Sequence, residues 1–406
     1  MPDLLGMDLG GTKLDFLLAA EDGTFLYEKQ YDSPFKKTGK TLASGDAEVL
    51  LDTILTHIPK AQRTAAYISR SEEKCLKQAR KEIGSFDIAG KGASLCGRTW
   101  EQDGNIVIAG GNTPMRFASG HDQDKPGIVV MKASADYPVT ATNDGTAAAT
   151  AQGIYYKVVH GIDPKKTAYF ILGTGFGCGI PHCDVPAEIG HIPVGFMPEA
   201  LWQTCGCTTG HPTACAENYA SGRGIANCAR TLLSLKDSPV LKTISPCLVR
   251  PTGFSGLSDF SNLSALVTDS RISRHRKTDA KTIMDYAKNN TDDLAVFIAD
   301  LAAQVTADAA IAAAQLFGLT RIGIGESVAR LNPWHVDNIA KKVADRTMNS
   351  NLLVPPLTVE LTPINNPAKY GALSLVVPES QYETWARKMA PSLRRDLPDR
   401  SHRGQS

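Results

Sequence analysis

The chain has 406 residues, of which 43 are lysine or arginine and 42 are aspartate or glutamate. A net charge of +1 gives no electrostatic reason to expect a nucleic-acid partner or a membrane surface, so we expect small-molecule ligands. A chain of this length is expected to form two domains, each with its own core.

Three strand-like segments joined by short glycine-containing turns open the chain, at residues 4–8, 14–20 and 24–31. Their spacing predicts a meander of hairpins. No charged leader region precedes them, and no stretch approaches the roughly 20 apolar residues of a membrane span. We therefore expect a cytoplasmic protein with no membrane partner.

The turn between the first two strands suits a phosphate group. Gly10 and Gly11 lack a Cβ and tolerate positive φ, so their backbone N–H groups can approach a polyphosphate closely. Asp8 ends the first strand and places a carboxylate where it could hold Mg²⁺ through water. Thr12 and Lys13 add a hydroxyl group and a positive charge beside the phosphate.

A second glycine turn follows a strand-like segment in the middle of the chain, and Gly173, Thr174 and Gly175 form its centre. Neither turn has the G-x-x-x-x-G-K-[ST] pattern, and each leads into a strand and not into a helix. This context excludes a P-loop and a dinucleotide fingerprint. A single glycine hairpin is equally consistent with a purely structural turn, but two of them favour a nucleotide held from both sides of a cleft.

Longer periodic segments alternate with strands in the rest of the chain, which predicts an α/β fold. The expected helices cover residues 46–58, 143–156 and 294–317, and the expected strands cover residues 104–111, 167–172 and 321–325.

The recurrence of the strand–turn–strand pattern predicts that a second domain repeats the opening of the first. We expect a small N-terminal α/β domain over residues 1–140, a larger C-terminal domain over 141–380 and a helix or basic tail over 381–406. Residues 231–290 are polar and irregular, and we interpret them as an insertion or a surface helix pair.

Six motifs in chain order resemble those of the ROK sugar kinases, a family that includes glucokinases, fructokinases and the kinases of N-acetylglucosamine and N-acetylmannosamine. They are Asp8-Leu-Gly-Gly-Thr-Lys13, Asn143-Asp-Gly-Thr-Ala-Ala-Ala149, the turn 172–177, Glu188-Ile-Gly-His191, Cys205-Gly-Cys207 with Cys215-Ala-Glu217-Asn-Tyr-Ala-Ser-Gly222, and Asn366-Pro-Ala-Lys-Tyr-Gly371. The resemblance runs to about residue 376. It implies two actin-like, ribonuclease-H-like domains with the active site in the cleft between them, and a homodimer.

The resemblance also implies ATP-dependent phosphorylation of a hexose or N-acetylhexosamine hydroxyl. Such a transfer requires a carboxylate near the hydroxyl, an in-line γ-phosphate and Mg²⁺. Asp144 occupies the position whose carboxylate takes the hydroxyl proton, whereas an isolated Asn-Asp pair is more often a helix cap.

Further positions of the family bind the sugar hydroxyls, and here they are Asn143, Glu188, His191 and Glu217. Gly97, Arg98 and Asn112 lie where related kinases place sugar-contacting loops, although a plain surface loop is an equal alternative. Arg98 favours an N-acetylhexosamine slightly.

The cysteines predict a structural zinc ion. Nine cysteines are an odd set, and in a reducing compartment a close cluster favours metal binding over disulfides. His191 with Cys205, Cys207 and Cys215 provides one imidazole and three thiolates, a closed tetrahedral set. Seven residues separate Cys207 from Cys215 where the family usually has four, and this longer loop brings in His211 as a competing ligand.

The segment 322–329 stands where the family has a run of glycines beside the adenine and ribose. Gly325 is retained, but Glu326 and Ser327 replace two glycines. ATP is the expected donor, and a polyphosphate or another nucleotide is the alternative. Two other classes of protein stay open: a sugar-binding regulator on the same scaffold, and an actin-like ATPase without a sugar substrate.

Overall fold

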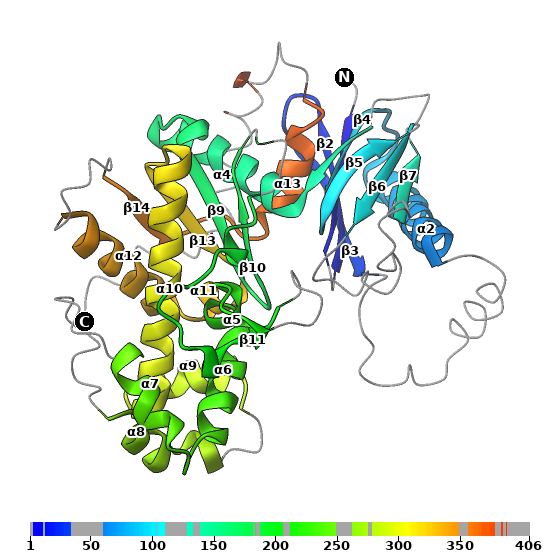
Figure 1. The fold of residues 1–406 in the computed structure, drawn as a ribbon. Helices are drawn as coiled ribbons and strands as arrows, with labels where there is room; N and C mark the ends of the chain where they lie inside the picture. Colours follow the sequence, from blue (N-terminus) through cyan, green and yellow to red (C-terminus); the bar gives the residue numbers. More distant parts are fainter. Residues whose placement is uncertain are drawn as a thin grey trace. The chain divides into compact units, whose positions relative to one another are not determined.

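The computed structural model describes residues 3–10, 13–33, 60–102, 104–109, 128–132, 139–181, 183, 187–205, 212–248, 262–274, 278–348, 356–377, 383–384 and 387. The chain forms two compact units. The first comprises Met1–Pro164, Gly179–Pro186 and Pro363–Ser406, and the second comprises Lys165–Cys178 and Ala187–Thr362. The α/β class predicted from the sequence is confirmed (Figure 1).

A five-stranded mixed sheet with the order β3-β2-β1-β4-β8 forms the centre of the first unit. Its strands are β1 (Asp3–Leu9), β2 (Lys13–Ala20), β3 (Phe25–Asp32), β4 (Ile88–Leu95) and β8 (Val139–Asn143). β1, β2 and β3 pair antiparallel, which confirms the predicted meander, while β4 is parallel to both β1 and β8.

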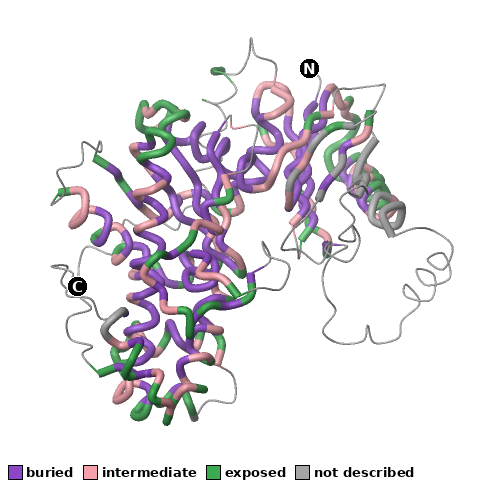
Figure 2. Tube along the Cα trace, in the orientation of Figure 1, coloured by how far each residue is buried: buried purple, intermediate pink, exposed green. Residues whose placement is uncertain are grey.

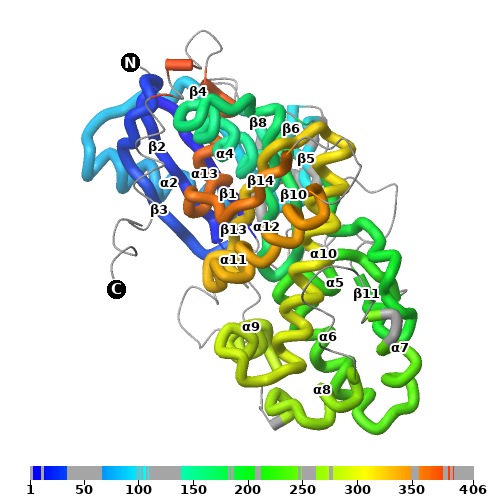
Figure 3. Tube along the Cα trace, turned by 90° about the vertical axis from the view of Figure 1, so that its left-hand side faces the viewer, coloured from blue at the N-terminus to red at the C-terminus, as the bar shows by residue number. Residues whose placement is uncertain are grey.

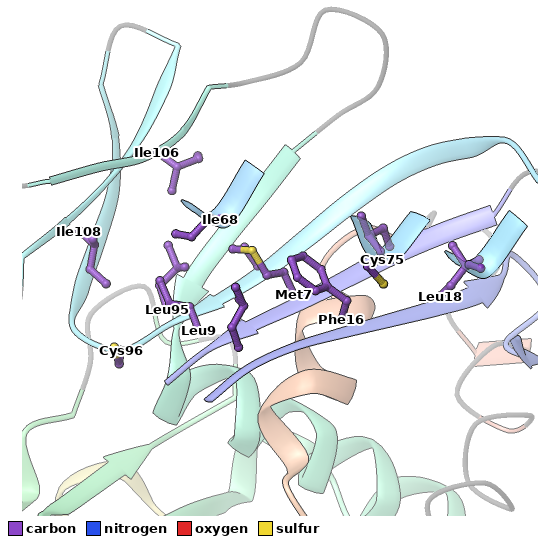
Figure 4. Close-up of a cluster of buried hydrophobic side chains, with 14 residues drawn as sticks. Met7, Leu9, Phe16, Leu18, Ile68, Cys75, Leu95, Cys96, Ile106 and Ile108 are labelled. Carbon is purple, nitrogen blue, oxygen red and sulfur yellow. The ribbon is translucent and has the colours of Figure 1, made fainter. Parts of the chain in front are cut away.

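Every residue of β1 is buried, so the strand shows no alternation of buried and exposed positions, and its two aspartates, Asp3 and Asp8, are buried with its apolar residues. Leu5, Met7 and Leu9 point into a core cluster that also receives Ile68 and Cys75 of α2 (Lys60–Ile83), as Figure 4 shows for its labelled members. Cluster members also come from a separate antiparallel sheet of β5 (Arg98–Gln102), β6 (Asn105–Ala109) and β7 (Ile128–Lys132).

Helices α4 (Asp144–His160) and α13 (Pro367–Ser374) pack against each other and on the face of the five-stranded sheet opposite to α2 (Figure 3). The approach is close because glycines stand at the crossing points. A Cβ on Gly92 of β4 would overlap the carbonyl of Ala372, and a Cβ on Gly371 of α13 would overlap the carbonyl of Ala147 in α4. Glycine is therefore required at both positions.

The second unit contains a four-stranded sheet with the order β10-β9-β13-β14. Its strands are β9 (Thr167–Leu172), β10 (Phe176–Gly179), β13 (Arg321–Gly325) and β14 (Thr358–Leu361), and its larger helices are α6 (Gly222–Ser234), α10 (Asp293–Phe317) and α12 (Pro333–Met348). β13 is parallel to both β9 and β14. Short helices α5 (Glu217–Ala220) and α11 (Glu326–Leu331) begin close to the ends of strands.

Helix α10 is long and apolar enough to cross a membrane by length and composition, and the expectation that no stretch approaches a membrane span is wrong on that measure. Eighty-three per cent of its most apolar window is buried inside the fold (Figure 2), where the helix contacts α12, α9, α6 and α5. Asp292 caps its start by accepting from the Ala295 N–H at 2.9 Å, and Gly318 ends it with a left-handed φ of 65°. These features are typical of a core helix.

The two units divide the chain differently from the expected domains. Helix α4, expected in the C-terminal domain, belongs to the first unit, because its apolar residues pack on the first sheet and on α13. The described parts of residues 231–290, which we interpreted as an insertion or a surface helix pair, are mostly helical. They form α7 (Val240–Leu248), α8 (Leu263–Asp269) and α9 (Ala280–Lys288), whose buried side chains include Leu263, Val267 and Ile283.

Most of the other expected helices and strands are present in the structure. The helix at 143–156 and the strands near 104, 167 and 321 are confirmed, as is the long helix at 294–317. The predicted helix over 46–58 and nearly all of the tail from residue 381 lie outside the described residues. Helix α2 was not predicted, because its buried face consists of few and mostly small residues, such as Cys75 and Ala79.

A buried histidine on α12 makes the second unit sensitive to acid. His335 is fully buried, and neither of its ring nitrogens has a hydrogen-bond partner among the described residues. Burial, and then the charge of Lys342, lower the pKa of His335 from 6.5 to about 4. Lys342 is itself paired with Asp300 of α10 at 2.7 Å, and Asn338 donates to the same carboxylate at 3.3 Å.

Lowering the pH from 7 to 4 is therefore expected to destabilise the protein through His335. Between these pH values the unfolded chain binds a proton at His335 and the folded chain does not, so the free energy of unfolding falls as the pH drops. The contribution amounts to about 3 kcal/mol at most. Urea unfolding across this pH range should show a weaker pH dependence for His335→Phe. The same substitution at the exposed His160 should keep the wild-type dependence, and equal slopes in all three proteins would contradict the assignment.

Candidate functional site

The carboxyl ends of three parallel strands bring the predicted catalytic residues of the first unit together. In the register of the sheet Leu9 of β1 lies beside Leu95 of β4, and Leu95 lies beside Asn143 of β8. Asp8 is 8% exposed and accepts a hydrogen bond from Ser94 Oγ at 2.7 Å. Asp8 and Ser94 near the ends of their strands, and Asp144 directly after β8, therefore lie at one edge of the sheet, where ligand-binding groups of open α/β sheets gather.

Asn143 caps helix α4, as the alternative interpretation of the Asn-Asp pair proposed. Its Oδ1 accepts from the Gly145 N–H at 2.8 Å, and its Nδ2 donates to the Gly97 carbonyl oxygen at 2.9 Å. Gly97 has a φ of 132°, a region that glycine alone adopts readily, so this loop position requires glycine. Asp144 is half-buried at the first turn of the helix, where its Oδ1 also accepts from the Gly145 N–H, at 2.9 Å. The cap fixes the backbone next to Asp144 and does not exclude a catalytic role for that carboxylate.

The two carboxylates of this edge lie within electrostatic reach of one thiol. Burial raises the pKa of Cys96 well above its usual range, and the charges of Asp144 and Asp8 raise it further. Cys96 therefore stays protonated and acts as a buried apolar side chain.

The first glycine turn is only partly described. Gly10 donates its N–H to the Lys13 carbonyl oxygen at 2.9 Å, and Ser33 Oγ donates to the Gly10 carbonyl oxygen at 2.6 Å. Lys13 is exposed, as a phosphate-binding side chain would be. Gly11 and Thr12 lie outside the described residues.

The second turn, in the second unit, is held by the segment that leads into α6. Gly173 accepts from the Gly222 N–H at 2.8 Å, and Thr174 accepts from the Arg223 N–H at 3.3 Å. Within the turn, Gly173 donates to the Gly175 carbonyl oxygen at 3.1 Å. The turn is thus fixed by backbone hydrogen bonds to a helix more than 40 residues away in the chain.

Glu217 supports this turn directly. Its side chain is buried, its Oε2 accepts from the Phe176 N–H at 3.0 Å, and its Oε1 accepts from Arg223 at 2.7 Å. A Cβ on Gly175 would stand 2.7 Å from Oε2, so the absence of a side chain there leaves room for the carboxylate. Glu217 therefore orders the turn, and its predicted contact with a sugar hydroxyl stays a prediction.

Three of the four predicted zinc ligands lie together. The ligand atoms of His191, Cys205 and Cys215 are all within 4.8 Å of one another, and the two cysteines are buried. Cys205 Sγ is 3.3 Å from His191 Nδ1, whereas His191 Nε2 is 3.7 Å from Glu188 Oε2. The imidazole thus faces the sulfur atoms with one nitrogen and the exposed Glu188 with the other. This set fits a tetrahedral thiolate–imidazole site. Cys207 and His211 lie outside the described residues.

The segment predicted to contact the nucleoside lies next to the second turn, because β13 runs parallel to β9 and both strands end there. A Cβ on Gly325 would overlap the hydroxyl of Tyr169. Glu326 follows with a left-handed φ of 70°, and its Oε1 accepts from Tyr169 Oη at 3.4 Å. A Cβ added to Gly173 would lie 3.5 Å from the Cβ of Glu326. Ser327 is exposed. The departures from glycine therefore stand directly beside the predicted phosphate turn.

The other sugar-loop positions are less defined. Arg98 begins β5, where its backbone pairs with Ala109, and Asn112 lies outside the described residues. Sequence reasoning missed Ser94 and Arg223. Ser94 could be found only from the register of the strands. Arg223 could have been noticed because it lies two residues after Ser221, the N-cap of α6, whose Oγ accepts from the Gly224 N–H.

Comparison with known proteins identifies the family. A sequence profile of the ROK family matches residues 123–378. The chain belongs to the ROK family. The resemblance predicted from the six motifs is thereby confirmed.

Curated relatives of the chain include kinases of N-acetylmannosamine and N-acetyl-D-glucosamine. The N-acetylmannosamine kinase of Escherichia coli is 25% identical over 247 residues, which cover 59% of this chain and 68% of the relative. The N-acetyl-D-glucosamine kinase of Haemophilus influenzae is 27% identical over 247 residues, which cover 56% and 66%.

Solved ROK structures share the fold. A ROK glucokinase from Streptomyces griseus, in complex with glucose and AMPPNP, has a TM-score of 0.53 at 21% identity and covers 92% of this chain and 98% of its own. A ROK transcriptional regulator, described as a homologue of the Escherichia coli MLC protein, has a TM-score of 0.56 at 14% identity and covers 96% and 81%. The expected fold class, that of the actin-like ROK sugar kinases, is confirmed.

Proposed function

We propose that this ROK protein is an ATP-dependent carbohydrate kinase that phosphorylates a hydroxyl group of a hexose or N-acetylhexosamine. The observation that carries the proposal is the pair of carboxylates Asp8 and Asp144 at one edge of the first sheet, where Asp8 lies near the end of β1 and Asp144 directly follows β8. The sugar kinases among the relatives support the substrate class.

Asp144 serves as the general base in this proposal. It accepts the proton of the sugar hydroxyl as the new O–P bond forms, and the bond from the γ-phosphorus to ADP breaks in line with it. Asp8 would hold Mg²⁺, which offsets the charge that develops on the phosphate oxygens. Each glycine turn would present backbone N–H groups to a phosphate group of the donor.

The relatives named for N-acetylmannosamine and N-acetylglucosamine make an N-acetylhexosamine our first choice of substrate. Glu188 and His191 are the proposed hydroxyl partners, with Asn143 and the residues near Gly97. ATP is the proposed donor, since a solved ROK structure holds an ATP analogue. We further propose a cytoplasmic homodimer.

A coupled assay of ATP consumption across hexoses and N-acetylhexosamines tests the proposal. ATP turnover that depends on one of these sugars is expected. ATP hydrolysis at full rate without any sugar would favour an actin-like ATPase.

A sugar-binding regulator is the second candidate, because a ROK regulator shares the fold. Saturable sugar binding with no ATP turnover on any sugar of the panel would favour it. The carboxylate pair of Asp8 and Asp144 supports the kinase, since binding alone requires no general base.

We also propose that His191, Cys205, Cys207 and Cys215 bind a structural zinc ion. The ion would tie the segment around Glu188 to the loop that leads to Glu217, and it would orient the His191 ring.

Replacing Cys205 by serine is expected to remove zinc, because a hydroxyl is a far weaker ligand than a thiolate. Elemental analysis of purified protein should find about one zinc per wild-type chain and little in the variant. Cys228→Ser, a buried position on α6 outside the cluster, should retain the metal. Wild-type protein without zinc would refute the site.

A further inference from the structure

We propose that Arg223 is a binding residue for the donor polyphosphate at the second glycine turn, with Glu217 as the residue that positions it. The inference deepens the proposed kinase function and rests on it. Arg223 belongs to none of the motifs that indicated the function, and only its contacts in the second unit draw attention to it.

The backbone of Arg223 is part of the turn. Its N–H donates to the Thr174 carbonyl oxygen at 3.3 Å, one residue after Gly222 donates to Gly173 at 2.8 Å. Arg223 is thus fixed at the turn by its main chain, so its side chain begins beside Gly173 and Thr174.

The guanidinium group of Arg223 is bound by one carboxylate, and its side chain is partly exposed to solvent. Arg223 donates to Glu217 Oε1 at 2.7 Å, and the other oxygen of this carboxylate accepts from Phe176, the residue after Gly175. The Glu217 side chain is 4% exposed, whereas that of Arg223 is 45% exposed. A guanidinium has five N–H donors, so one ordered contact leaves others that an anion can reach.

Charge at the turn favours this role. Glu217 lies against Gly175, and Glu326 packs beside Gly173, so two carboxylates border the turn. Without a cation these carboxylates would repel a polyphosphate. Arg223 contacts one of them directly, and an arginine can bind phosphate through parallel N–H···O bonds while it stays paired.

The start of α6 does not by itself account for phosphate binding. The first N–H groups of this helix are occupied, since Gly222 and Arg223 donate to the turn and Gly224 donates to Ser221 Oγ at 3.0 Å. The helix end therefore serves to anchor the turn. The Arg223 side chain is the group placed to meet the ligand.

Binding of ATP and of adenosine to the intact protein, measured by calorimetry, tests the assignment. Arg223→Ala is expected to weaken ATP binding by about 10- to 100-fold, as for a lost charge-assisted hydrogen bond. Adenosine binding should change less than about twofold, because adenosine has no phosphate. Arg223→Lys should recover part of the ATP affinity through its point charge.

Two further variants separate a ligand contact from a structural role. Arg223→Gln can still donate to Glu217 but carries no charge, and it should weaken ATP binding while keeping the wild-type melting temperature. Arg230→Ala also removes one positive charge, from an exposed position on α6, and should leave the affinities for ATP and adenosine unchanged.

An ATP affinity in Arg223→Ala equal to that of wild-type protein would overturn the inference, as would an equal loss of ATP and adenosine binding. Wild-type protein that binds ATP but phosphorylates no sugar would refute the kinase while leaving the assignment of Arg223 to be decided by its variants. Wild-type protein that binds no ATP would overturn both.

Discussion

Replacing Asp144 by asparagine is expected to lower kcat by about 10²- to 10⁴-fold, the usual contribution of a general base. The amide keeps the shape of the side chain and an oxygen that can accept from the Gly145 N–H, so the start of α4 should be preserved. It has no lone pair able to take the hydroxyl proton near neutral pH. The sugar should therefore still bind, with a Kd close to that of the wild type.

Steady-state kinetics with the preferred sugar measures kcat, and calorimetry measures the Kd of the sugar. Asp285→Asn makes the same chemical change at an exposed position on α9 and should have wild-type kinetics. Turnover within a factor of a few of wild type in Asp144→Asn would remove this residue from the role of base. Loss of sugar binding in the same variant would point to a binding role.

The elements nearest to the proposed chemistry were predictable because their signals are local. Asn143 precedes an alanine-rich run and is the N-cap of α4, as the helix-start pattern indicates. The glycines of the two turns interrupt apolar strands, and in the structure β1 ends before the first interruption and β2 begins after it, as β9 and β10 do at the second. The residues proposed to meet a ligand at each turn were therefore identifiable from neighbouring positions in the chain.

The supporting contacts were not predictable, because they join residues far apart in the sequence. Asp15 looks like a surface residue in a strand, but it is 1% exposed and accepts from Gln30 at 2.7 Å and from Asn366 at 3.0 Å. Asn366 is 351 residues away from it. The contacts of the Glu217 carboxylate with Phe176 and Arg223 were likewise not expected, and its contact with a sugar hydroxyl stays a prediction. The spacing of apolar residues in the sequence indicates which face of a helix or strand is buried. It does not indicate which residues pack against that face.

Gly371 illustrates how such a distant contact supports the site. It lies in α13, where this helix crosses α4, and a Cβ there would overlap the carbonyl group of Ala147. The obstacle is helix backbone, which cannot change rotamer as a side chain would. Any larger residue must push α13 away from α4, the helix whose first residue is Asp144.

Gly371→Val is accordingly expected to lower the free energy of unfolding by about 4 kcal/mol or more, since overpacking against backbone leaves little room for relaxation. Gly371→Ala should lie between this variant and wild type. Urea unfolding followed by circular dichroism measures the change. Gly195→Ala is the matched control, because a Cβ at Gly195 meets nothing within 4 Å, and its stability should stay near that of wild type. A Gly371→Val protein as stable as this control would show that α13 and α4 do not pack at the distance described.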